Sequence, residues 1–112
     1  KMGLNLSRGL PIKYYSSDRI TQITGNGLVT LIDEKTCYRD FFTDKEMIFY
    51  KNLSDLSEKI SKISQDEKLR KSIGKNGKEK YLKYFNSTLV AEFIINKCFD
   101  INNKNYYLWH NR

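Results

Sequence analysis

This sequence of 112 residues is short of the residue types that build metal sites, disulfides and membrane spans. It has one histidine, His110, and two cysteines, Cys37 and Cys98, which form no CxxC pair, so the usual zinc sites are excluded. No apolar run approaches the ~18 residues that a transmembrane helix needs. Two free thiols and an N-terminus without signal-peptide character predict a cytoplasmic protein.

Acidic side chains are fewer than basic ones, 13 against 20, which gives a formal net charge of +7. An excess of lysine is found in proteins that bind nucleic acid, anionic membranes or phosphate-bearing ligands. Here the positive charge is spread along helical segments instead of forming one block, which favours solvated helix faces as its explanation. A hydrophobic content of 39% is enough for a modest core in one domain or part of one.

Strand-like and helix-like segments alternate along the chain. Short apolar runs predict strands over residues 2–7, 28–32 and 47–50. A short helix is expected over residues 19–24, and Gly25-Asn26-Gly27 should end it. Three longer helices follow from about residue 53. This alternation predicts an α/β fold, in which a small parallel sheet of about three strands is flanked by helices.

Each of the three C-terminal helices has an expected start and an expected buried face. Their expected first residues or caps are Asn52 or Ser54, then Asp66, then Asn86 or Ser87. Helical spacing predicts that these residues are buried: Leu53, Leu56, Ile60 and Ile63; Leu69, Ile73, Gly77 and Tyr81; Leu89, Val90, Phe93, Ile94 and Cys98. Glycine inside a helix costs about 1 kcal/mol relative to alanine. Gly77 is therefore expected where another element approaches closely.

Candidate binding residues gather where the first strand ends and the first helix begins. The strand ends at Ser7-Arg8 and the helix begins at Ser17-Asp18-Arg19. Both segments should lie at the carboxyl ends of the strands, where ligands bind in open α/β sheets. Free N–H groups at a helix N-terminus and guanidinium groups suit a phosphate, and the Gln22 amide can bond sugar hydroxyls. The simpler alternative is that Ser17 and Asp18 only cap the helix and Arg19 is a surface residue.

From its start to about Phe99 the chain resembles the GT-B glycosyltransferases called glycosyl transferases group 1, particularly the spore-maturation-type subfamily. That subfamily has a strand, a Ser-rich loop, Arg-x-x-Glu, then four residues and a glycine before an apolar strand. Here Arg19-Ile20-Thr21-Gln22 and Gly27-Leu28-Val29-Thr30 have that spacing. Gln22 stands where the family usually has a glutamate that holds the donor ribose. Glutamine can still accept a hydrogen bond but lacks the charge.

The resemblance implies a Rossmann-like C-terminal half-domain of a GT-B fold. Residues 1–99 would form part of a nucleotide-sugar binding domain, and residues 100–112 a polar tail. The implied activity is transfer of a sugar from a nucleoside diphosphate sugar to an acceptor, with no metal or other cofactor bound by the protein. The expected donor-binding residues are Asn5, Ser7, Arg8, Ser17, Asp18, Arg19 and Gln22. The catalytic base and acceptor site are expected in a missing N-terminal domain, so this chain alone should be inactive.

Two alternatives have a sequence basis. Gly74-Lys75-Asn76-Gly77 resembles the GxxG loop with which KH domains clamp RNA, although Lys80 stands where that pattern needs an apolar residue. Because no strands follow Tyr81, nucleic acid is not the expected partner. The other alternative is a non-catalytic interaction module. A small sheet with an open edge, and exposed aromatic residues at Tyr14, Tyr15, Phe41 and Phe42, would favour self-association.

Overall fold

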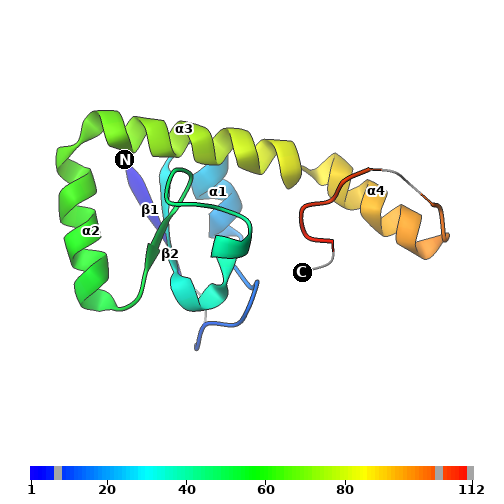
Figure 1. Ribbon diagram of the computed structural model, residues 1–112, viewed down its shortest axis with the longest axis horizontal. Helices are drawn as coiled ribbons and strands as arrows, with labels where there is room; N and C mark the ends of the chain where they lie inside the picture. Colours follow the sequence, from blue (N-terminus) through cyan, green and yellow to red (C-terminus); the bar gives the residue numbers. More distant parts are fainter. Residues whose placement is uncertain (7–8, 103–104, 111–112) are drawn as a thin grey trace.

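The computed structural model describes residues 1–6, 9–102 and 105–110. Its centre is a parallel three-stranded sheet in the order β1-β2-β3, formed by Met2–Asn5, Val29–Asp33 and Ile48–Tyr50 (Figure 1). The pairing places Met2 beside Val29 and Leu31 beside Ile48. The predicted α/β class, with three parallel strands flanked by helices, is therefore confirmed, and the arrangement is that of a Rossmann-like half-domain.

Apolar side chains cover both faces of this sheet, because its central strand is buried from Val29 to Ile32. On one face, Leu31 and Tyr50 pack against Leu56 and Ile63 of α2 (Leu53–Gln65). On the other, Ile32 and Phe49 pack against Ile20 of α1 (Arg19–Gly25). Two buried residues of the segment after β2, Phe41 and Phe42, complete this second cluster. The prediction that they are exposed is wrong, since their rings pack beneath Phe85.

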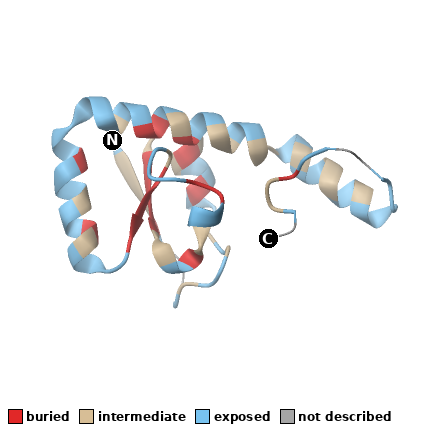
Figure 2. Ribbon diagram, viewed as in Figure 1, coloured by how far each residue is buried: buried red, intermediate tan, exposed pale blue. Residues whose placement is uncertain are grey.

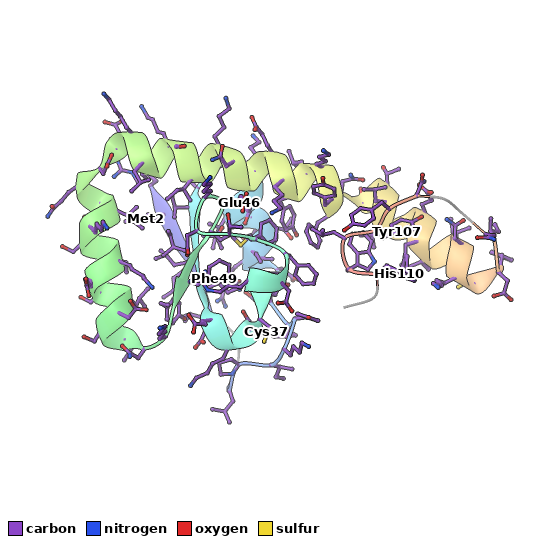
Figure 3. All side chains as sticks on the ribbon, in the orientation of Figure 1. Met2, Cys37, Glu46, Phe49, Tyr107 and His110 are labelled. Atoms are coloured by element: carbon purple, nitrogen blue, oxygen red, sulfur yellow. The ribbon has the colours of Figure 1, made fainter. Side chains whose placement is uncertain are left out.

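Helix α3 (Glu67–Tyr84) crosses the edge of the sheet where β2 and β3 begin. Two glycines permit this crossing. A methyl group on Gly74 would overlap the carbonyl oxygen of Gly27, and one on Gly77 would overlap that of Glu46. The expectation that an element approaches closely at Gly77 is thus confirmed. Beside it, the Glu46 carboxylate lies under α3, 3.5 Å from Lys80 Nζ (Figure 3).

The last helix, α4 (Ser87–Cys98), extends beyond the sheet and contains no buried residue (Figure 2). The predictions that Val90, Ile94 and Cys98 are buried are wrong: Val90 is 39% and Ile94 54% exposed, and Cys98 is exposed. Among the described residues, 105–110 fold back along one side of α4. Phe93 meets the rings of Tyr107 and Trp109 there.

The starts of α2, α3 and α4 agree with the expected caps. The side chains of Asn52, Asp66 and Asn86 accept hydrogen bonds from the first turns of α2, α3 and α4. The expected buried faces are only partly confirmed. Leu56, Ile63 and Ile73 are buried, whereas Leu53 is 81%, Ile60 36% and Leu69 38% exposed. The latter three lie on sides of α2 and α3 that the described part of the chain leaves accessible to solvent.

Candidate functional site

The carboxyl ends of the three strands form one edge of the sheet, which is called the rim below. Asn5, Asp33 and Tyr50 are the last residues of β1, β2 and β3. Helix α1 begins at the same edge, because it must return to the amino end of β2 after β1. In parallel α/β sheets this is the edge where ligands bind.

Asn5 and Ser17 meet at the rim. Ser17 Oγ donates a hydrogen bond of 2.9 Å to Asn5 Oδ1. Asn5 is 2% exposed, and its Nδ2 has no hydrogen-bond partner among the described residues. Gly3 allows α1 to lie this close to β1, since a Cβ there would be 2.6 Å from a side-chain carbon of Ile23. Two of the predicted site residues are thereby brought into direct contact.

Arg19 joins this pair from the first turn of α1. Its Nη1 donates to the carbonyl oxygen of Leu6 at 3.2 Å, which ties the start of α1 to the end of β1. Asp18, Arg19 and Gln22 are exposed, so their side chains are accessible to a ligand. The remaining two predicted residues, Ser7 and Arg8, lie outside the described part of the chain.

Phosphate binding at the N-terminus of α1 stays a prediction, and the helix dipole would contribute little to it. α1 has seven residues, fewer than two full turns, so its dipole is small. The alternative that Ser17 and Asp18 only cap the helix is not borne out by their side chains: Asp18 stands at the N-cap position but makes no capping hydrogen bond, and Ser17 is bonded to Asn5. Side chains, and not a long helix dipole, have to supply any anion-binding capacity of the rim.

A second group of residues holds the rim and was missed by the sequence reasoning. Tyr14 Oη donates a hydrogen bond of 2.5 Å to Asp40 Oδ2. The hydroxyl oxygen of Tyr38 lies 3.1 Å from Ser16 Oγ, and burial raises the pKa of this phenol. In the sequence, the tyrosines were the only signal for this group. Their presence does not predict contacts between residues 14–16 and residues 38–40, which are more than 20 positions apart.

The described residues include no group of three or more His, Cys, Asp or Glu side chains that could hold a metal ion. They also include no helix that is both long and apolar enough to cross a bilayer. Cys37 and Cys98 are both free thiols.

The Gly74–Gly77 segment lies far from the rim. It is helical and lies within the 18 residues of α3, at the opposite edge of the sheet. Both glycines face the neighbouring backbone, so they cannot form the open loop that a KH domain uses to clamp RNA. The KH-like alternative is therefore not favoured.

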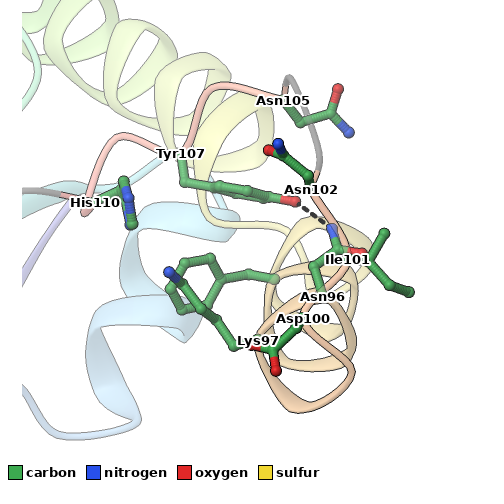
Figure 4. Close-up of a pocket in the computed structure, with 9 residues that line it drawn as sticks. Asn96, Lys97, Asp100, Ile101, Asn102, Asn105, Tyr107 and His110 are labelled. Atoms are coloured by element: carbon green, nitrogen blue, oxygen red, sulfur yellow. Dashed lines mark hydrogen bonds between the residues drawn. The ribbon is translucent and has the colours of Figure 1, made fainter.

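A cavity of about 450 Å³ lies between α4 and the residues after it (Figure 4). Asn96, Lys97, Asp100 and Tyr107 are among its lining residues, and Asn96 Nδ2 donates to Tyr107 Oη at 3.1 Å. None of the predicted site residues that the structure describes lines it. The rim remains the candidate site, because only there do several of the predicted residues come together.

A family model described as glycosyl transferase-like matches residues 1–96. Neither the curated proteins nor the solved structures gave a match. The matched range includes the whole sheet, the rim and helices α1 to α3. Because the match covers most of the 112 residues, the chain belongs to the glycosyl transferase-like family.

Proposed function

We propose that the chain is the donor-binding portion of a glycosyltransferase that moves a sugar from a nucleoside diphosphate sugar to an acceptor. The observation that carries this is the meeting of Asn5, Ser17 and Arg19 at the rim of a domain whose family is glycosyl transferase-like. The spore-maturation-type subfamily, with the Arg19 to Gln22 spacing, is the branch we assign it to. A cytoplasmic location suits a nucleotide-sugar substrate and two free thiols.

Each rim residue has a separate role in this proposal. Arg19 is exposed, and among the described contacts its side chain is bonded only through Nη1, to the Leu6 carbonyl. Its other guanidinium nitrogens would bind the diphosphate. Ser17 holds the start of α1 on Asn5, and its hydroxyl oxygen still has lone pairs free. Gln22, one turn further along α1, bonds the ribose hydroxyls through its amide. Asp18 is the weakest of these assignments, since a carboxylate repels a diphosphate.

Transfer requires one group that the rim offers and others that it does not. Stabilising the departing diphosphate needs positive charge aimed at its oxygens, and Arg19 provides this charge. The catalytic base and the acceptor site are assigned to a second domain of the same protein. The proposal includes the donor as ligand and no metal or other cofactor.

The test is a titration of the ¹⁵N-labelled chain with UDP and with GDP at fixed salt. Nucleotide binding at the rim shifts amide signals of residues 17–27. Arg19→Ala should weaken binding by at least about tenfold, because a charge-assisted hydrogen bond is worth about 1.5–3 kcal/mol. Lys75→Ala is the matched control: it also removes one exposed cation, but from α3 at the other edge of the sheet.

Equal losses from Arg19→Ala and Lys75→Ala would mean that the nucleotide responds to net charge alone, which contradicts the rim as the site. Shifts confined to residues 74–80 would contradict it as well. Because Arg19 also bonds the Leu6 carbonyl, the thermal midpoint of each variant is measured alongside the affinity. An affinity loss without a matching loss of stability identifies a ligand contact.

A further inference from the structure

Two segments beside the rim are joined through one tyrosine. The first, residues 9–18, leads from β1 to α1 and carries Ser17; the second, residues 34–41, follows β2. Tyr14 of the first segment donates its backbone N–H to the Thr36 carbonyl at 2.8 Å and its hydroxyl to Asp40 at 2.5 Å. Its ring lies 5.0 Å from that of Phe41.

The backbone of Tyr14 is in a conformation that its side chain does not favour. Its φ is +60°, in the left-handed region, and Tyr15 N–H bonds the Ile12 carbonyl at 3.1 Å to close a four-residue turn. The third position of such a turn, where φ is positive, is usually glycine or asparagine. A tyrosine there has a strained backbone, and contacts of its side chain have to offset the cost of that strain. The bonds to Asp40 and the packing on Phe41 are such contacts.

Tyr38 extends the connection towards the predicted site. Its hydroxyl oxygen lies 3.3 Å from the Tyr14 carbonyl oxygen and 3.1 Å from Ser16 Oγ. Ser16 is the neighbour of Ser17, which bonds Asn5, and Arg19 follows two residues later. The contacts of Tyr14 thus end directly before the residues that are proposed to hold the donor.

We propose that Tyr14 is a positioning residue for the donor site, which holds residues 15–19 in place by fixing segment 9–18 on segment 34–41. This inference rests on the proposed function. Without the bond to Asp40, the turn at residues 12–15 is free to relax from its strained conformation. Ser17 and Arg19 then sample several positions, and the affinity for the donor falls with the population of the competent one.

The experiment measures two quantities on the same variants of the full chain: the affinity for UDP and GDP, and the amide hydrogen exchange of residues 14–20. Tyr14→Phe removes the bond to Asp40 but keeps the ring on Phe41. It should weaken nucleotide binding by about fivefold or more and speed exchange of the Tyr14 and Ile20 amides, with little change in the thermal midpoint. Tyr15→Phe is the matched control, because Tyr15 is adjacent and 46% exposed.

Two further variants separate positioning from a general effect on stability. Asp40→Asn still offers an oxygen to the Tyr14 hydroxyl and should behave like the wild type. Asp40→Ala removes the acceptor and should reproduce Tyr14→Phe in both affinity and exchange. A uniform loss of exchange protection throughout the sheet in these variants would contradict a local positioning role.

The outcomes distinguish this inference from the proposed function. If the wild type binds nucleotide at residues 17–27 and Tyr14→Phe binds equally well, the positioning role is wrong and the proposed function stands. If the wild type binds neither UDP nor GDP, the proposed function of the chain fails, and the role of Tyr14 in donor binding fails with it.

Discussion

The sheet with helices α1 to α3 and the segment formed by α4 and residues 105–110 are held by different means. In the first region, strands and helices bury aliphatic and aromatic side chains on both faces of a sheet. In the second, the helix has no buried residue (Figure 2). Residues 105–110 contact it along one side through aromatic rings and side-chain hydrogen bonds such as that from Asn96 to Tyr107. Stability should therefore be concentrated in the first region, and the rim belongs to it.

The largest effect is expected where α3 crosses the sheet. Gly74→Ala places a methyl group against the carbonyl oxygen of Gly27, and backbone on both sides leaves little room to adjust. We expect a loss of about 3 kcal/mol or more in the free energy of unfolding, measured by urea denaturation. Gly25→Ala is the control: the added methyl group meets no described atom within 4 Å beyond the adjacent residues and its own helix backbone, so its effect should be within about 0.5 kcal/mol. Similar effects of the two substitutions would mean that α3 does not pack this tightly.

An intermediate effect is expected where the second region attaches to the first. The ring centroid of Trp109 lies 5.6 Å from that of Phe85, which packs on the core of the first region, and 5.8 Å from that of Phe93 of α4. Trp109→Ala should release α4, so that amides 89–98 exchange rapidly with solvent while those of β2 stay protected. A shift of the whole unfolding transition by more than about 2 kcal/mol would instead make the two regions one cooperative unit.

The difference between the regions also explains which sequence predictions succeeded. Strand and helix ranges were predictable because apolar runs and capping residues act locally, as at Asn52 and Asp66. The predicted burial of Val90 and Ile94 failed, because helical spacing marks an apolar face but does not say that a partner covers it. Gly77 was more informative. Because glycine lowers the stability of a helix, its presence inside α3 indicated that another element approaches closely there, as the Glu46 backbone does.

The candidate site was predictable only in part. That Asn5, Ser17 and Arg19 share one edge follows from the order of strand and helix, and their contacts agree with it. The role of Ser17 did not follow, since a serine before a helix reads equally well as a cap. The positive φ of Tyr14 and its bond to Asp40, 26 residues further on, are tertiary features that no local pattern encodes.

The smallest effect concerns an electrostatic contact at the same edge as Gly74 and Gly77. Partial burial of Glu46 disfavours its charged form, but hydrogen bonds from the Thr43 N–H and hydroxyl and the nearby Lys80 ammonium outweigh this and lower its pKa below the usual 4.5. A carboxyl group whose pKa is lower in the folded state stabilises the fold above pH 4.5 and ceases to do so as the pH falls through the lowered value.

Glu46→Gln should therefore reduce the free energy of unfolding at pH 7 by about 1 kcal/mol or less and flatten its decline below pH 4.5, as measured by denaturation at several pH values. Glu79→Gln is the control, since that carboxylate is 65% exposed and 3.8 Å from its lysine partner. A decline as steep in Glu46→Gln as in the wild type would assign the acid sensitivity to other groups. The packing of α3 on the sheet would then depend on the close approach at Gly74 and Gly77, and the Glu46 charge would make no measurable contribution to stability.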